Sequence, residues 1–189
     1  MLHDLVTRNR SYRRFYQDKA ITKKQLEDLV ELARLSPSTA NIQPLKFILS
    51  WKPEKNSLIF SCLAWAGYLK DWHRPEEGEQ PAGYIIVAGD TEIAKDFGCN
   101  HGIASQSILL GATEMGFGGC MIASIQRERL RDLLAIPARY EILLVLAIGE
   151  PKERVVIVEA KDGDIKYWRD VNKTHHVPKR LLSEIILDL

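Results

Sequence analysis

The hydrophobic pattern of the chain predicts helices and strands that alternate along it. The capping box Thr22-Lys-Lys-Gln25 opens a helix whose apolar residues recur at helical spacing, and Pro37 predicts that this helix ends near Leu35. Two continuous apolar runs, 84–88 and 141–149, are typical of buried strands. The second run is the most apolar of the chain, so we expect that strand at the centre of a sheet.

The rest of the hydrophobic pattern also predicts alternating helices and strands, although each of these signals is weaker. It predicts helices at 2–8, 53–63, 126–134 and from about residue 181, and short strands at 46–50 and 120–122. Residues 154–160 and 165–168 are predicted to pair as a hairpin, because Asp162-Gly163 between them suits a tight turn. This alternation predicts an α/β or α+β sandwich, with helices covering one mixed sheet.

The stretch from Asn100 to Ser124 stands apart because its helix has no fully polar face. Residues 102–115 are typical of a buried helix, and small residues such as Gly111 and Ala112 would allow another backbone to approach. Three glycines are predicted to end the helix and to turn the chain into a strand: Gly116, Gly118 and Gly119. Such a turn would bring bare backbone up to a flat ligand, although a core helix followed by an ordinary turn is the simpler interpretation.

The totals are those of an ordinary globular protein. With 189 residues, 46% hydrophobic and 27% charged, we expect one domain covering residues 1–189. The formal net charge of +1 argues against a general nucleic-acid surface. Three widely spaced cysteines, Cys62, Cys99 and Cys120, favour a reducing compartment over a disulfide framework. Because no apolar run reaches the roughly 20 residues of a membrane span and no signal peptide is evident, we expect a cytoplasmic protein without a membrane partner.

A basic segment at 8–14 is the strongest local sign of chemistry. Arg10, Ser11 and Arg13 lie within it, and arginine and serine offer donors that fit phosphate oxygens. A solvated basic loop would have the same composition. The pair Lys179-Arg180 after Pro178 offers further cations but is a weak sign alone.

The loop Ser36–Pro44 is the second candidate. Two prolines make it rigid, and its hydroxyl and amide side chains offer hydrogen bonds of both kinds, as the edge of a heterocycle requires. These side chains would equally serve to bond the loop's own backbone. Elsewhere no metal-ligand spacing is found, since His175 and His176 are adjacent, and no nucleophile with its base stands out. We therefore predict no metal site and no catalytic side chain.

Taken together, five stretches resemble the FMN-dependent nitroreductase family in order and over nearly the whole chain. They are RSYRRF, ARLSPSTANIQPLKFI, GIASQSILLGATEMGFGGCMI, EILLVLAIGEPKE and PKR. The resemblance implies an α+β fold with a central mixed, mainly antiparallel sheet flanked by helices and a long buried central helix at a dimer interface. It also implies an obligate homodimer with one FMN in each of two sites between the subunits.

The resemblance carries over to named residues. Arg10, Ser11 and Arg13 would hold the FMN phosphate and the pyrimidine side of the ring, and Lys179 and Arg180 would clamp the phosphate. The other subunit would supply a loop near the ring: Pro37, Ser38 and Thr39, supported by Asn41 and Gln43. Backbone donors at Ala123 and Ser124 would face the ring nitrogen that accepts hydride. The chain departs from the family at Asn9 and Asn100, where many relatives have arginine and aspartate.

The implied function is that of an oxidoreductase in which FMN carries the chemistry. NAD(P)H would donate hydride and a nitroaromatic, quinone or similar small acceptor would then take its place, in a ping-pong cycle. Arg13 is the candidate cation that favours the reduced, anionic flavin. The aromatic segment 64–81 would either roof the flavin or simply pack on the surface. Dehalogenation, flavin cleavage and a non-catalytic flavin- or nucleotide-binding regulator are the alternatives.

Overall fold

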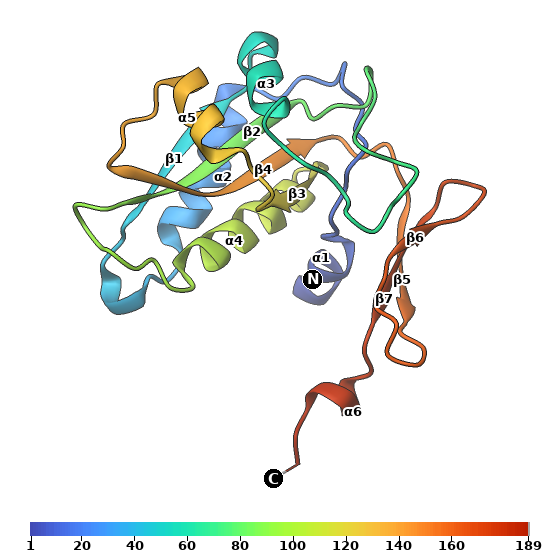
Figure 1. Cartoon of the computed structure of the whole chain (residues 1–189). Coiled ribbons are helices and arrows are strands. Elements are labelled where there is room, and N and C mark those ends of the chain that lie inside the picture. The colour runs from blue at the N-terminus through green and yellow to red at the C-terminus, as the bar shows by residue number, and fades with distance from the viewer. Residues whose placement is uncertain (189) are drawn as a thin grey trace.

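A computed structural model describes residues 1–188 of the chain (Figure 1). Its centre is a four-stranded antiparallel sheet with the strand order β1-β2-β4-β3. The strands are β1 (Leu45–Ser50), β2 (Gly83–Asp90), β3 (Gly118–Ile122) and β4 (Tyr140–Gly149). β2 and β4 are the inner strands, which confirms the prediction that the most apolar run lies at the centre.

Helices cover both faces of this sheet (Figure 1). They are α2 (Lys23–Leu35) and α4 (Asn100–Glu114) on one face, and α3 (Pro53–Phe60) and α5 (Arg127–Leu134) on the other. Side chains alternate along β2: Tyr84 and Ile86 join the core beneath α3 and α5, while Ile85 and Val87 join the core beneath α2 and α4. Every residue of β2 is buried, which confirms that this strand is covered on both faces.

The shorter elements largely follow the predicted pattern. α1 (Leu2–Arg8) matches the expected first helix and contacts α4, and η1 (Thr39–Asn41) is a single 3-10 turn. The capping box of α2 is confirmed, because Thr22 Oγ1 accepts from the Gln25 backbone N–H and the Gln25 side chain accepts from the Thr22 N–H. α3 ends at Phe60 rather than at residue 63, since tighter turns replace its last predicted turn.

Gly111 and Ala112 of α4 are packed within the chain, where helix α2 lies against α4. A Cβ atom at Gly111 would lie 2.2 Å from Leu32 Cδ1 of α2, and Ala112 is fully buried. α4 instead exposes Gln106 and half-exposes Ile103 and Leu110, which share one side of the helix. Any partner of α4 would therefore meet this second side.

Only one of the three glycines predicted to form the turn does so. Gly116 has a φ of +83°, a conformation that suits glycine, and it follows the end of α4. Gly118 and Gly119 lie in β3, where they permit close packing. A Cβ at Gly118 would lie 2.5 Å from the ring of Tyr12, and one at Gly119 would lie 2.6 Å from the carbonyl oxygen of Ala147.

A second sheet forms an arm that projects from the body of the molecule (Figure 1). Its order is β5-β7-β6, with β5 (Val155–Glu159), β6 (Trp168–Arg169) and β7 (His175–Lys179), and the one-turn helix α6 (Leu182–Ile185) follows. The predicted hairpin is wrong, because β5 pairs in parallel with β7 and β6 pairs with β7 from the other side. The tight turn at Asp162-Gly163 does form, as a bridge between Lys161 and Asp164.

An ion pair ties the N-terminal segment to the polar segment 64–81. Both nitrogens of the Arg14 fork donate to Glu79 at 2.6 Å, and Lys152 Nζ lies 3.2 Å from the same carboxylate. The hydrogen bonds from Arg14, and then those from Lys152, lower the pKa of Glu79 to about 2. Because the folded-state pKa is depressed, the stabilisation is present above the ordinary pKa and is lost as pH falls toward 2.

Glu79→Gln should therefore reduce the pH dependence of stability between about pH 5 and pH 2. At neutral pH we expect a loss of about 2 kcal/mol, since hydrogen bonds to charged groups are removed. Urea denaturation at pH 7, 5 and 3 measures both effects. Glu77→Gln, at an exposed position of the same segment, is the matched control. An unchanged pH profile in Glu79→Gln would show that this carboxylate does not contribute to acid sensitivity.

Candidate functional site

Four of the predicted residues line one cavity between the body and the arm. Arg10, Ser11 and Arg13 come from the segment after α1, and Lys179 comes from the end of β7. The cavity measures about 280 Å³, and its other lining residues are Asn9, Tyr167, His175 and Val177. We call it the basic cavity. Two stretches that lie at opposite ends of the sequence therefore form one site.

The backbone of the N-terminal segment is held in place by hydrogen bonds to the body. Tyr12 N donates to Gly119 O of β3 at 3.0 Å, and Phe15 N donates to Glu79 O at 3.0 Å. The Phe15 side chain is fully buried. Tyr16 N donates to Glu150 O just beyond β4. The segment that carries the arginines is thus fixed before any ligand arrives.

The two arginines of the basic cavity keep their charge available. Arg10 Nη2 donates to Val6 O at 2.6 Å, while Arg10 Nε is buried with no hydrogen-bond partner among residues 1–188. Arg13 donates to Ser11 O at 3.3 Å. In the described part of the chain neither guanidinium forms an ion pair with a carboxylate. Cations without a counter-charge favour an anionic ligand.

Arg180 is exposed and follows β7 directly, but it does not line the basic cavity. Its neighbour Lys179 is exposed as well and does line it. The predicted pair is therefore divided in this structure, with one cation in the wall and the other beside it.

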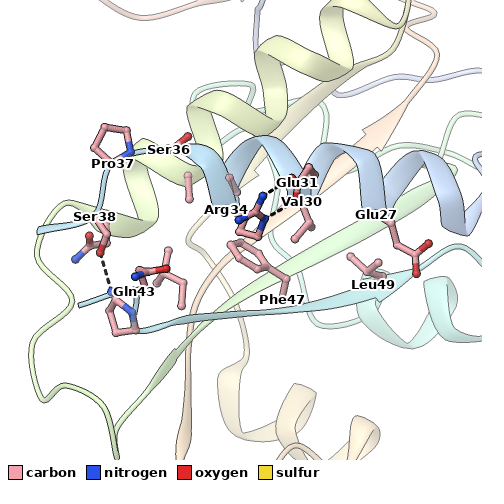
Figure 2. A pocket seen from close by; sticks show the side chains of 15 residues that line it. Glu27, Val30, Glu31, Arg34, Ser36, Pro37, Ser38, Gln43, Phe47 and Leu49 are labelled. Atoms are coloured by element: carbon pink, nitrogen blue, oxygen red, sulfur yellow. Dashed lines mark hydrogen bonds and ion pairs between the residues drawn. The ribbon is translucent and has the colours of Figure 1, made fainter. Parts of the chain in front are cut away.

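The predicted loop contributes to a different cavity of about 390 Å³, between α2, β1 and α4 (Figure 2). Pro37, Ser38 and Gln43 line it, and apolar residues such as Phe47 and Leu49 form its floor. We call it the loop cavity. Within residues 1–188 it shares no lining residue with the basic cavity. The two sets of predicted residues are thus not brought together in one chain.

The loop is held in an unusual backbone conformation. Ala40, Asn41 and Gln43 have φ angles of 49°, 54° and 52°, a left-handed region that is uncommon for residues other than glycine. Ser38 Oγ accepts from Gln43 N, and Asn100 Oδ1 accepts from Thr39 N, both at 2.9 Å. Thr39 and Asn41 are exposed and line neither cavity. Strained backbone of this kind is concentrated at functional sites.

Ala123 and Ser124 lie beyond the end of β3 and are exposed. The carbonyl oxygen of Ser124 accepts from Ala64 N at 3.0 Å, which links the strand to the start of the segment 64–81. Neither residue lines the basic cavity or the loop cavity.

The aromatic residues of the segment 64–81 have separate environments. Trp65 is buried in the core, where its ring centroid lies 5.9 Å from that of Phe60. Tyr68 and Trp72 line a third cavity of about 530 Å³, together with residues of the arm. Tyr167 lies in the walls of both this cavity and the basic cavity. The segment therefore borders the candidate site, although part of it is ordinary core.

Three polar residues that support the basic cavity were not predicted from the sequence: His175 lines it, Glu153 contacts the Arg13 backbone, and Arg169 pairs with Glu153. Glu153 and Arg169 form a buried pair at 2.7 Å, with side chains that are 0% and 14% exposed. His175 is fully buried, and its Nε2 lies 3.3 Å from Arg13 Nη1. Burial, followed by the nearby charges of Arg13 and Arg169, lowers the pKa of His175 to about 4. Its imidazole is therefore neutral at pH 7.

Comparison with known proteins assigns a family to this arrangement. The sequence model of the nitroreductase family matches residues 6–150, which include the arginine segment, the loop and β3. The chain belongs to the nitroreductase family. The predicted family is thereby confirmed, and membership of this family supports the prediction that the protein is an oxidoreductase. The arm, with His175 and Lys179, lies outside the matched residues.

Similar proteins agree with this assignment. A relative from Archaeoglobus fulgidus, provisionally named NADH dehydrogenase/NAD(P)H nitroreductase, is 27% identical to this chain over 157 residues, which are 79% of this chain and 85% of the relative. A nitroreductase family protein from Streptococcus pneumoniae superposes with a TM-score of 0.73 at 17% identity, over 100% of both chains. An FMN-dependent nitroreductase from Clostridium difficile superposes with a TM-score of 0.68 at 22% identity, over 89% of this chain and 98% of the other. The predicted α+β nitroreductase fold is confirmed.

Two further findings concern the part of the chain that the structure describes. Within residues 1–188, no group of three or more His, Cys, Asp or Glu side chains is arranged to hold a metal ion. None of the described helices has both the length and the apolar character needed to cross a membrane.

Proposed function

We propose that this member of the nitroreductase family binds FMN and uses NAD(P)H to reduce nitroaromatic, quinone or similar small acceptors. The observation that carries the proposal is the basic cavity, where Arg10, Arg13 and Lys179 converge without a carboxylate that neutralises the two arginines. The described residues fit the phosphate of FMN in charge, and the unpartnered Nε of Arg10 is a donor that an anion would satisfy. When bound, FMN supplies the hydride chemistry.

The protein's own residues would bind and orient the cofactor. Arg10, Ser11, Lys179 and Arg180 are proposed to hold the phosphate, and Arg13 is proposed to lie by the pyrimidine edge, where a cation favours the reduced form. From the loop cavity we propose Pro37, Ser38 and Thr39 near the ring, supported by Asn41 and Gln43. Ala123 and Ser124 would offer backbone donors to the ring. The name of the Clostridium difficile protein, FMN-dependent nitroreductase, supports this choice of cofactor.

We further propose that the working form is a homodimer, in which one subunit supplies the basic cavity and its partner supplies the loop cavity. The separation of the two cavities within one chain supports this assignment. A partner would also cover exposed apolar residues of α1 and α6, such as Leu2, Val6, Leu182 and Ile185. The single domain of residues 1–189 and the cytoplasmic location stay predictions.

The first prediction of this proposed function concerns the cofactor and its reaction. We expect the purified protein to be yellow, to release FMN and not FAD on denaturation, and to bleach with NADH or NADPH without oxygen. Chromatography of the released flavin and stopped-flow absorbance, followed by a panel of acceptors, measure these outcomes. A yellow protein that neither nicotinamide bleaches would favour the regulatory alternative. Failure to bind FMN on reconstitution would overturn the proposal.

The second prediction separates cofactor binding from hydride transfer. Arg180→Ala should weaken FMN binding by about ten- to a hundred-fold, because a charge-assisted hydrogen bond to the phosphate is lost. The bleaching rate of the fraction that stays loaded should change little. Arg129→Ala removes another exposed arginine, on α5 and outside the walls of both cavities, and should have no effect on affinity. An unchanged affinity with a slower bleaching rate would contradict the proposed role of Arg180.

A further inference from the structure

The guanidinium of Arg13 is held by neutral groups. Its Cζ lies 4.8 Å from the centre of the Tyr167 ring, a cation–π distance. Its Nη1 lies 3.3 Å from Ser11 O and 3.3 Å from His175 Nε2. None of these partners carries a negative charge when the histidine is neutral.

The carboxylate that contacts the backbone of Arg13 forms its ion pair with another residue. One oxygen of Glu153 accepts from the backbone N–H of Arg13, and the other accepts from Arg169 Nη2 at 2.7 Å. Glu153 therefore fixes the backbone of Arg13 and pairs with a different guanidinium. The side chain of Arg13 keeps its full charge, although it is packed against the arm.

The contact with Arg13 determines the tautomer of His175. Arginine can only donate hydrogen bonds, so Nε2 of His175 must accept and the proton of the neutral ring must lie on Nδ1. Nδ1 is buried and has no hydrogen-bond partner within residues 1–188. Burial, together with Arg13, Arg169 and His176, lowers the pKa of this imidazole. A buried donor left unsatisfied is uncommon in proteins and points to a function for the acceptor on the other side of the ring.

We propose that His175 is a positioning residue that fixes Arg13 through a neutral acceptor, so that the whole charge of Arg13 is available to an anionic group of the flavin. This inference rests on the proposed function, because it takes FMN as the ligand of the basic cavity. A carboxylate at position 175 would hold Arg13 equally well but would neutralise it. The unpartnered Nδ1 is then the consequence of an imidazole that must accept from Arg13 without carrying a charge.

Three substitutions of His175 separate these properties. His175→Gln replaces Nε2 by an amide oxygen that lies the same number of bonds from Cα, so it keeps a neutral acceptor. His175→Glu has nearly the same shape but carries a negative charge. His175→Leu has no acceptor. Circular dichroism and thermal unfolding show whether each variant folds, and the Gln and Glu variants form a matched pair if the Leu variant does not.

The measurements are the dissociation constants of FMN and riboflavin for the apo forms and the midpoint potential of the bound flavin. We expect His175→Gln to bind FMN within about threefold of the unsubstituted protein, and His175→Leu about tenfold more weakly, as for loss of one charge-assisted hydrogen bond. His175→Glu should bind at least as weakly as His175→Leu. If Arg13 acts on the flavin ring, the affinity for riboflavin falls as well as that for FMN. A loss of affinity that is tenfold larger for the reduced than for the oxidised flavin lowers the midpoint potential of the bound flavin by about 30 mV. If Arg13 acts on the phosphate, only FMN affinity changes.

Equal FMN affinity in the Gln and Glu variants would overturn the proposal, because the charge at position 175 would then be irrelevant. A Leu variant that matches the unsubstituted protein in affinity and potential would also overturn it. If the unsubstituted protein itself does not bind FMN, the proposed function fails instead, and the two failures are thereby distinguished.

Discussion

Leu110→Arg is expected to convert the protein to a monomer and to release its flavin in the same step. Leu110 is half-buried on the side of α4 that faces away from the sheet, so its substitution spares the core of one chain. In a two-fold interface the new charge would occur twice, and an uncompensated buried charge costs roughly 3–5 kcal/mol. The dimer dissociation constant should therefore rise at least about a thousand-fold.

Sedimentation velocity follows the mass in this experiment, and absorbance follows the bound flavin. Leu133→Arg on α5 is the matched control, because Leu133 is 40% exposed and its helix covers the opposite face of the sheet. Gly111→Arg would not serve, since any side chain there collides with α2. A folded, yellow monomer of Leu110→Arg would show that each flavin site is built within one chain.

Glu153→Gln is expected to cause the largest loss of stability among the polar substitutions considered. The carboxylate is fully buried, accepts from the Arg13 backbone and pairs with Arg169, whose side chain is only 14% exposed. Its loss leaves a mostly buried guanidinium without a counter-charge, which destabilises by about 3–5 kcal/mol. For a chain of this size, this lowers the melting temperature by roughly 10 °C.

Differential scanning calorimetry of the apo protein measures this change without a contribution from flavin binding. Glu128→Gln is the control, because Glu128 is 88% exposed and lies 3.9 Å from Arg131. Surface pairs of this kind contribute at most about 1 kcal/mol. If the two variants unfold at the same temperature, the buried pair does not stabilise the fold.

The elements whose signals are local were predicted correctly. The capping box at Thr22, the apolar run of β4 and the glycine after α4 each act through a few neighbouring residues. The predicted hairpin at 154–168 was wrong for the opposite reason. Its turn forms, but β5 pairs with β7, and no local pattern reports a parallel partner that is distant in sequence.

In the candidate site, too, the residues with a local sequence signal were predicted and those that depend on distant contacts were not. Arg10, Ser11 and Arg13 could be found because three suitable side chains lie within one short segment. His175 was weighed only as half of the adjacent pair His175-His176, which lacks metal-ligand spacing, and its contact is with Arg13 from the other end of the chain. Glu153 lies within the stretch EILLVLAIGEPKE that carries the family resemblance, but neither spacing nor composition indicated its burial.

The join between the two ends of the chain in the basic cavity also determines when that cavity can form during synthesis. Because synthesis runs from the N-terminus, all four strands of the central sheet have been made once β4 has appeared. Lys179 and His175 belong to β7, which is made later and needs β5 beside it. The body can thus be packed while the cavity still lacks a wall, and capture of the cofactor would be among the last steps of biogenesis.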